Sequence, residues 1–319
     1  MNPFNPLPLL GNPHVQTILG NLLTGVPHPS RSKRSAVALP DGDRIALHET
    51  PPRRATRNNH APIALLVHGL GGSHRSAYML RTTQRLSGLG WRVVRMDLRG
   101  AGVGIRLARR FYNAACTADL HAVIEYLLNA FPDAQLSVVA FSLGGNIALK
   151  YAGEYADRLP LRLRGVAVLA PPIDLVRCSE LIARYPFYDA FFVRHLTHQV
   201  AEHQRYFPDV PKVVFPRRML LRDFDEVYTA PRWGFASALD YYRRASSLPW
   251  VESIRVPTFI LAARDDPFVA VAPFEELRPP ECVRLQIVEQ GGHMGFLGPD
   301  GMGGIRWAET QVIDWLGQH

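Results

Sequence analysis

Cysteine and long apolar runs are scarce in this chain of 319 residues. The three cysteines, Cys116, Cys178 and Cys282, are widely separated, and an odd number without metal spacing argues against a disulfide framework. We therefore expect thiols packed in the core of a cytoplasmic protein. No apolar run reaches the roughly eighteen residues of a membrane-spanning helix. The proline-broken start also lacks the basic region of a signal peptide, so we expect neither feature.

Lysine is nearly absent too. Lys33, Lys150 and Lys212 are the only lysines, so arginine supplies most of the formal net charge of +8 and the pI of about 9.7. The arginines are scattered in small groups, and no nucleic-acid-binding motif accompanies them. This pattern favours a solvated arginine-rich surface and no nucleic-acid partner, with weak attraction to anionic lipid as the second interpretation. Nothing in the sequence assigns an oligomeric state.

What the chain does contain is an alternation of strand-like and helix-like stretches. Its length and its 47% hydrophobic content fit one globular domain over residues 1–319, with an N-terminal extension over about 1–34. The alternation predicts an α/β fold, a mainly parallel eight-stranded sheet flanked by helices. The expected strands are 35–39, 44–49, 63–67, 92–96, 136–141, 166–170, 258–262 and 284–288. The expected helices are 76–89, 116–130, 145–155 and 304–316.

Residues 174–233 interrupt this rhythm. The segment is rich in aromatic and long apolar side chains at helical spacing and contains no strand pattern. A structureless connection of this length is improbable in a compact domain. We expect a helical cap inserted after the sixth strand and covering a serine, Ser142, that follows the strand at 136–141. Phe187 and Phe191 of this cap are expected to lie beside the acyl chain of a substrate.

A sharp turn is predicted at Ser142, where the apolar stretch 136–141 ends and a helix-forming stretch begins. Strand, strained turn and helix form a nucleophile elbow, which exposes the serine hydroxyl above the sheet. The usual pattern is G-x-S-x-G, and Ala140 replaces the first glycine here. Alanine is the least disruptive substitute, because this position needs close approach of strand and helix. Ser142 is therefore the candidate nucleophile.

A serine nucleophile needs a base and an orienting acid, and both follow in the chain order expected of such an elbow. The candidate base is His293, within the glycine-rich GGHMGF segment after the last strand. The candidate acid is Asp266, which follows the strand at 258–262 and precedes a proline and an aromatic residue. Asp265 is the alternative acid, and it could instead brace the turn.

The reaction also needs donors for the developing oxyanion. We expect the backbone N–H of Leu143, directly after the nucleophile, and that of Leu70 in the loop HGLGGS. His68 in this loop is interpreted as a residue that shapes it. Asp97 and Arg99 follow the strand at 92–96 and are interpreted as structural braces at the rim of the site.

No metal or cofactor is expected. The spacing of His195, His198 and His203 matches no zinc pattern, so we interpret them as a solvated helix face. The chain contains neither a phosphate loop nor a dinucleotide fingerprint.

Several segments together resemble a known family, the YheT-like α/β-hydrolases, whose relatives include abhydrolase-domain lipases and yeast medium-chain ethyl ester synthase/esterases. The segments that carry the resemblance are NPHVQTI at 12–18, DGD at 41–43, the HGLGGS loop at 68–73, FSLGGN at 141–146, FDE at 224–226, YYRRAS at 241–246, DDPF at 265–268 and the Gly292-His293 pair. The resemblance implies an α/β-hydrolase fold and a triad of Ser142, His293 and Asp266. Ala140 departs from the family's usual glycine, and the membrane anchor of the animal members is not seen.

These features predict a serine hydrolase that acts on carboxylic esters through an acyl-enzyme. The aromatic cap predicts a small-molecule ester with an apolar acyl chain. Acyl transfer to an alcohol and thioester hydrolysis are the alternatives within enzymes. A non-catalytic binding protein on the same fold ranks behind them, because the serine, the histidine and the acid are all present.

Overall fold

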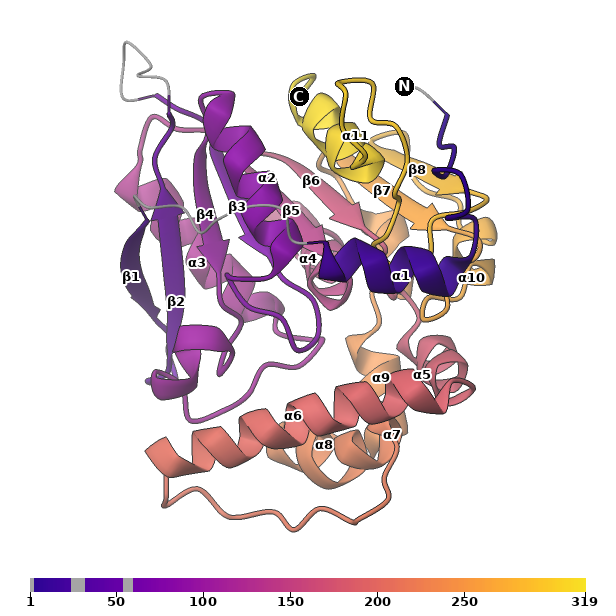
Figure 1. The fold of residues 1–319 in the computed structure, drawn as a ribbon. Coiled ribbons are helices and arrows are strands. Elements are labelled where there is room, and N and C mark those ends of the chain that lie inside the picture. Colours follow the sequence, from indigo (N-terminus) through magenta and orange to yellow (C-terminus); the bar gives the residue numbers. More distant parts are fainter. Residues whose placement is uncertain (1–2, 24–31, 54–59) are drawn as a thin grey trace.

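The computed structural model describes residues 3–23, 32–53 and 60–319 (Figure 1). One sheet with the strand order β1-β2-β4-β3-β5-β6-β7-β8 forms its centre. β2 runs antiparallel to both of its neighbours, and the other pairs are parallel. The strands are β1 (Lys33–Ala38), β2 (Arg44–Thr50), β3 (Ile63–Val67), β4 (Arg92–Met96), β5 (Leu136–Phe141), β6 (Leu163–Leu169), β7 (Thr258–Ala263) and β8 (Val283–Val288). The predicted mainly parallel eight-stranded sheet is confirmed.

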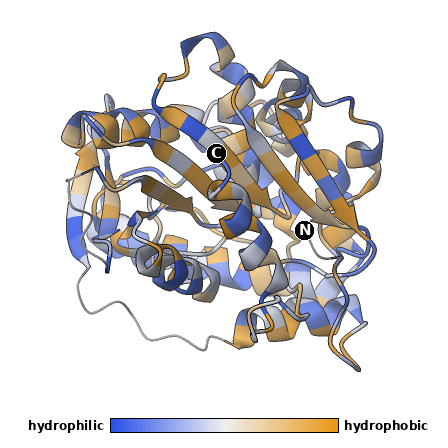
Figure 2. Ribbon diagram, turned by 90° about the horizontal axis from the view of Figure 1, so that it is seen from above, coloured by the Kyte–Doolittle hydropathy of each residue, from blue (hydrophilic) through white to orange (hydrophobic). Residues whose placement is uncertain are grey.

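The central strands are buried on both faces, as their unbroken apolar runs predict. Successive side chains of a strand point to opposite faces, and the core is divided accordingly. Leu65 and Val138 belong to the apolar cluster on one face, and Leu66 and Val139 belong to the cluster on the other. Seen from above, strands rich in hydrophobic residues lie between helices whose ribbons alternate between hydrophobic and hydrophilic residues (Figure 2).

The helices that cover the sheet have the expected order, but some ends differ. The last helix begins at Trp307 instead of 304, because positive φ angles at Gly301 and Gly303 keep the preceding residues in turns. The helices and helical turns outside the segment between β6 and β7 are α1 (Pro13–Leu22), α2 (Ala77–Gly88), η1 (Gly102–Arg106), α3 (Thr117–Ala130), α4 (Leu143–Glu154), η2 (Ala156–Arg158), α10 (Ala272–Glu275) and α11 (Trp307–Leu316).

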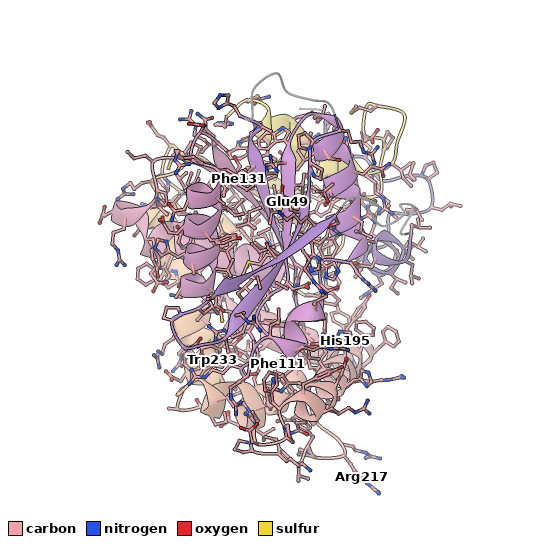
Figure 3. All side chains as sticks on the ribbon, turned by 90° about the vertical axis from the view of Figure 1, so that its left-hand side faces the viewer. Glu49, Phe111, Phe131, His195, Arg217 and Trp233 are labelled. Atoms are coloured by element: carbon pink, nitrogen blue, oxygen red, sulfur yellow. The ribbon has the colours of Figure 1, made fainter. Side chains whose placement is uncertain are left out.

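The segment between β6 and β7 contains no strand and forms a helical layer at one end of the sheet (Figures 1 and 3). Its interior is not helical throughout, because prolines at 208, 211 and 216 leave residues 207–220 irregular. Its elements are α5 (Leu175–Ala183), α6 (Pro186–Tyr206), α7 (Leu221–Phe224), the π-helical turn η3 (Asp225–Thr229), α8 (Ala230–Arg232), α9 (Ala238–Ala245) and η4 (Leu248–Ser253).

Two of the three α6 histidines contradict the expectation of a solvated face. His203 is fully buried and donates from Nε2 to the carbonyl oxygen of Ala108 at 2.9 Å. His195 donates from Nε2 to the carbonyl oxygen of Gly71 at 2.7 Å, at the boundary between the helical layer and the sheet (Figure 3). Only His198 is exposed. The first two therefore fasten α6 to loops of the sheet.

No helix within the described parts of the chain is both long and apolar enough to cross a bilayer. The three cysteines are free thiols, with Cys116 and Cys178 buried and Cys282 partly buried.

Candidate active site

Ser142 stands alone between the end of β5 and the start of α4. Its backbone has φ 50° and ψ −122°, a region that residues other than glycine rarely adopt and that costs about 1–3 kcal/mol. Small neighbours make this turn feasible. A Cβ on Gly144 would lie 2.5 Å from the carbonyl oxygen of His68, so the helix could not approach β3 with a larger residue there. The predicted strand, strained turn and helix are all present.

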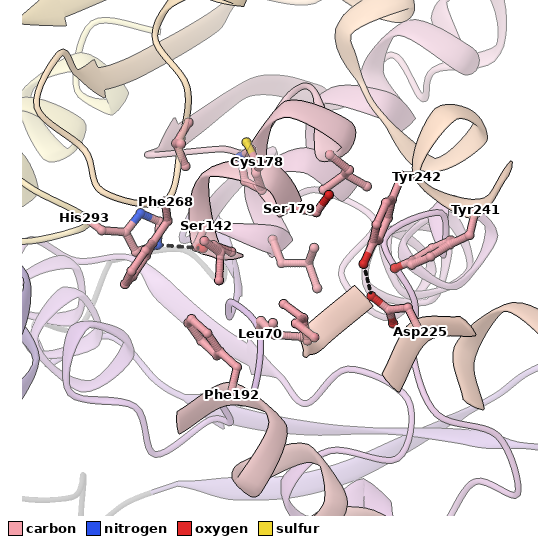
Figure 4. A pocket seen from close by; sticks show the side chains of 16 residues that line it. Leu70, Ser142, Cys178, Ser179, Phe192, Asp225, Tyr241, Tyr242, Phe268 and His293 are labelled. Carbon is pink, nitrogen blue, oxygen red and sulfur yellow. Dashed lines mark hydrogen bonds between the residues drawn. The ribbon is translucent and has the colours of Figure 1, made fainter. Parts of the chain in front are cut away.

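The structure brings Ser142, His293 and Asp266 into one line of hydrogen bonds. Ser142 Oγ lies 2.9 Å from His293 Nε2, and His293 Nδ1 lies 2.8 Å from Asp266 Oδ2 (Figure 4). The imidazole and the carboxylate are both buried. Since a carboxylate only accepts, Nδ1 carries the proton and Nε2 is free to accept the hydroxyl proton of the serine.

The two neighbouring aspartates have different partners. Asp266 Oδ1 accepts from the backbone N–H groups of Phe268 at 2.7 Å and Val269 at 3.0 Å, which leaves Oδ2 for His293. Asp265 Oδ1 instead accepts from the N–H of Gly292 at 2.9 Å. Burial raises the pKa of Asp265 above its usual range. Asp265 thus braces the loop that carries the histidine and does not contact the imidazole.

The two expected oxyanion donors lie beside the serine. Leu70 and Leu143 line the same cavity as Ser142 and His293. Leu143 is the first residue of α4, so its N–H has no acceptor within the helix. The Leu70 loop touches the elbow so closely that a Cβ on Gly69 would lie 2.9 Å from the Ser142 Cβ. The backbone of this loop therefore packs directly against the elbow.

His68 shapes this loop, and both of its ring nitrogens are bound to backbone groups, so it cannot act as a second base for Ser142. Its Nε2 accepts from the N–H of Leu98 at 3.0 Å, and its Nδ1 donates to the carbonyl oxygen of Gly69 at 2.8 Å. Burial lowers the pKa of His68, so the ring stays neutral with both nitrogens occupied.

Asp97 and Arg99 brace the neighbouring loops. Asp97 is fully buried and accepts from His48 Nε2 at 3.1 Å and from His74 Nδ1 at 2.9 Å. Burial raises the pKa of Asp97, but these hydrogen bonds outweigh it and hold the pKa far below its usual range. Arg99 forms a two-pronged pair with Asp119, with donor–acceptor distances of 2.9 and 2.6 Å.

The helix α1 holds the loop of the candidate base, which the sequence did not reveal. Thr17 Oγ1 accepts from the N–H of His293 at 2.9 Å. Gln16 is fully buried, and its Oε1 accepts from the N–H of Leu297 at 2.7 Å. A Cβ on Gly295 would lie 2.5 Å from the carbonyl oxygen of Gln16, so the two segments meet backbone to backbone. The NPHVQTI motif was the only hint of this contact in the sequence. It does not identify the partner, because Gln16 and Leu297 are 281 residues apart along the chain.

Removal of the Thr17 hydroxyl tests this positioning role. Thr17→Val preserves the side-chain volume but leaves the N–H of His293 without its acceptor. We expect kcat for ester hydrolysis to fall roughly 10- to 100-fold with little change in KM, because the imidazole is displaced from the serine. Thr197→Val is the matched control, since Thr197 Oγ1 donates to the Val193 carbonyl oxygen of its own helix. Equal kcat values for the two variants would refute the role.

The cavity at Ser142 has a volume of about 90 Å³ and mainly apolar walls. Its aromatic lining consists of Phe192 of α6, Tyr241 and Tyr242 of α9, and Phe268 (Figure 4). The expectation for Phe187 and Phe191 was wrong, because their side chains are 71% and 60% exposed. Phe192 projects from a different side of α6 and lines the cavity instead. The sequence does not specify how α6 is rotated about its axis.

The chain matches the sequence model of the α/β hydrolase fold across residues 62–300. Together with the sheet order and the elbow, this match assigns the class: the chain belongs to the α/β-hydrolase family. The relatives that it matches over most of its length make it an enzyme of the esterase and lipase type. It is 30% identical to YheT of Escherichia coli strain K12, over 98% of this chain and 92% of that protein. It is 28% identical to phospholipase ABHD3 of Homo sapiens, over 88% of this chain and 70% of that protein.

Solved structures show the same fold at lower sequence similarity. The esterase Pf2001 of Pyrococcus furiosus superposes with a TM-score of 0.57 at 17% identity, over 98% of this chain and 99% of that one. The 2,6-dihydroxy-pseudo-oxynicotine hydrolase superposes with a TM-score of 0.60 at 19% identity, over 95% and 70% of the two chains.

Proposed function

We propose that the chain is a serine hydrolase of carboxylic esters that works through an acyl-enzyme, with Ser142 as nucleophile, His293 as general base and acid, and Asp266 as the orienting acid. The observation that carries this proposal is the unbroken line of hydrogen bonds from Ser142 Oγ through His293 to Asp266, at 2.9 and 2.8 Å. The line ends at a cavity large enough to receive part of a substrate.

In the first half-reaction, Ser142 Oγ attacks the ester carbonyl carbon while His293 Nε2 takes the hydroxyl proton. Asp266 stabilises the imidazolium that forms and keeps Nδ1 protonated. His293 then gives the proton to the departing alkoxide, and the alcohol leaves. Water attacks the acyl-enzyme by the same steps, which returns the carboxylic acid and the free serine.

The negative charge on the carbonyl oxygen needs donors that are already in place. The N–H groups of Leu70 and Leu143 are proposed for this role, and loss of one such donor typically lowers the rate about 10²- to 10³-fold. Both groups belong to the main chain. The loop of Leu70 is held on either side, because the N–H groups of Gly69 and Gly71 donate to the hydroxyls of Tyr78 at 3.0 Å and Tyr112 at 2.8 Å.

The apolar walls favour an ester with an apolar acyl chain. We assign the cap to residues 174–233 of a single domain, because α5, α6 and α7 supply much of the cavity wall. Two similar proteins are named phospholipase ABHD3 and medium-chain fatty acid ethyl ester synthase/esterase 2, the latter from Saccharomyces cerevisiae and 28% identical. These names agree with an acyl ester as substrate. The cytoplasmic location inferred from the sequence stays a prediction.

The second name also supports acyl transfer as an alternative fate of the acyl-enzyme. An alcohol that outcompetes water would give a new ester. Hydrolysis of an ester in the presence of added ethanol separates the two outcomes. Free acid as the main product supports the hydrolase, and ethyl ester as the main product supports the transferase.

Phe192 provides a test of the acyl cavity. Phe192→Ala enlarges the space beside Ser142, so we expect the preference for longer over shorter acyl chains to rise roughly tenfold. The ratio of kcat/KM across a chain-length series of chromogenic esters measures this preference. Phe187→Ala is the matched control, because Phe187 is a phenylalanine of the same helix with 71% of its side chain exposed. A shift of the same size in both variants would place the acyl chain elsewhere.

A further inference from the structure

A carboxyl group stands in the wall of the catalytic cavity. Asp225 is the only carboxylate among the described residues that line the cavity around Ser142. It is the first residue of η3, and π-helical turns occur often at functional sites. Figure 4 shows its carboxyl group on the opposite side of the cavity from Ser142, with Leu70 between them. The proposed reaction does not use it.

This carboxyl group lacks a positive partner. Its hydrogen-bond partners are neutral: Tyr242 donates its hydroxyl to Asp225 Oδ2 at 2.7 Å, and the Thr229 side chain is a second partner. No Lys, Arg or His side chain in the described parts of the chain forms an ion pair with it, and it is 9% exposed. Burial accordingly raises the pKa of Asp225 to about 6, so the group is mostly ionised at neutral pH. Burying an unpaired charge is unfavourable, and a ligand that supplies the missing charge would remove that penalty.

The surroundings of the carboxylate are aromatic. A second cavity of about 30 Å³ shares Leu70, Leu143, Asp225 and Tyr241 with the first, so Asp225 lies where the two meet. The aromatic residues around this second space are Phe111, Tyr112, Phe224, Tyr228 and Tyr241. A carboxylate among aromatic side chains is the environment in which proteins bind ammonium groups.

We propose that Asp225 is a specificity-determining residue that pairs with an ammonium group at the far end of the substrate chain occupying the cavity. This proposal rests on the proposed ester hydrolysis and narrows its substrate class to esters whose buried chain is apolar along its length and ends in an ammonium group. The same carboxylate would repel a chain that ends in a carboxylate. A purely structural role, in which Asp225 only ties η3 to Tyr242 of α9, is the competing explanation.

Esters matched in chain length test the proposal. Chromogenic esters with a terminal methyl, ammonium or carboxylate group are compared on the wild-type protein and Asp225→Asn, which keeps an acceptor for Tyr242. We expect Asp225→Asn to lower kcat/KM for the ammonium ester relative to the methyl ester roughly 10- to 100-fold, the usual range for a buried charge pair. The kcat/KM for the carboxylate ester, relative to the methyl ester, should rise in the same variant.

Two further variants separate recognition from structure. Tyr242→Phe removes the tie to α9 and leaves the charge, so the ammonium preference should persist. Asp189→Asn removes another buried carboxyl of the same helical layer, one that accepts from the N–H of Leu221 at 2.7 Å and does not line the cavity. This variant should keep the wild-type preference. An unchanged preference in Asp225→Asn, or an equal loss in Tyr242→Phe, would overturn the proposal.

A binding measurement keeps this result independent of turnover. Calorimetry measures hexylammonium and hexanoate binding to Ser142→Ala with and without Asp225→Asn. Binding of hexylammonium that requires Asp225 supports the site, even if no ester is hydrolysed and the proposed function fails. If ester turnover requires Ser142 but hexylammonium binds equally well with and without Asp225→Asn, the proposed function is supported and the ammonium site is overturned.

Discussion

Ser142→Ala should lower kcat for ester hydrolysis by roughly 10⁶-fold, down to the rate that binding and the oxyanion donors alone sustain. The hydroxyl is the group in the hydrogen-bonded line that forms the acyl bond, and among the described residues no other hydroxyl or thiol is hydrogen-bonded to the His293 ring. The measurement is hydrolysis of a chain-length series of chromogenic esters, with thermal unfolding as the check on folding.

A second serine in the same cavity serves as the matched control. Ser179 also lines the cavity, but its Oγ donates to the carbonyl oxygen of Val176 at 2.8 Å and has no base beside it. Ser179→Ala should change kcat by only a few-fold. A fluorophosphonate should label the wild-type protein at Ser142 and leave Ser142→Ala unlabelled. Labelling at another residue, or full turnover by Ser142→Ala, would refute the nucleophile.

The adjacent aspartates give the second large effect. Asp266→Asn should lower kcat/KM by roughly 10⁴-fold, because an amide at 2.8 Å from Nδ1 favours the tautomer whose Nε2 cannot accept the serine proton. Asp265→Asn retains an oxygen for the N–H of Gly292 and should lose less than about tenfold, as expected for a brace. The kcat/KM values of Asp266→Asn and Asp265→Asn, measured on one ester at one pH, decide which aspartate is the triad acid. The opposite order of effects would make Asp265 the triad acid.

Much of the fold follows from local sequence. The bounds of β3, β4 and β5 coincide with the predicted 63–67, 92–96 and 136–141, because buried parallel strands read as unbroken apolar runs between turn residues. The predicted bounds are wrong where the end of a strand depends on pairing with a neighbouring strand. β6 begins at Leu163 and not at 166, since pairing with β5 extends it beyond its apolar run.

The site was predictable where chain order alone places a residue. Ser142 at a strand end and His293 after the last strand lie together because the carboxyl ends of parallel strands share one edge of the sheet. The rotation of α6 about its own axis is not fixed by local sequence, so the sequence points to Phe191 although its neighbour Phe192 lines the cavity. The contact between Thr17 and His293 was equally hidden, because no local pattern reports a partner at the other end of the chain.

That last contact joins two segments that lie far apart along the chain. Gln16 and Thr17 bind residues 297 and 293, so the loop of the candidate base is held in place only when these segments have met. Contacts between residues so distant in sequence must overcome a large loss of chain entropy, and folds that depend on them form more slowly than folds built from local contacts. We therefore expect the proposed line of Ser142, His293 and Asp266 to be complete only after these two segments have come together during folding.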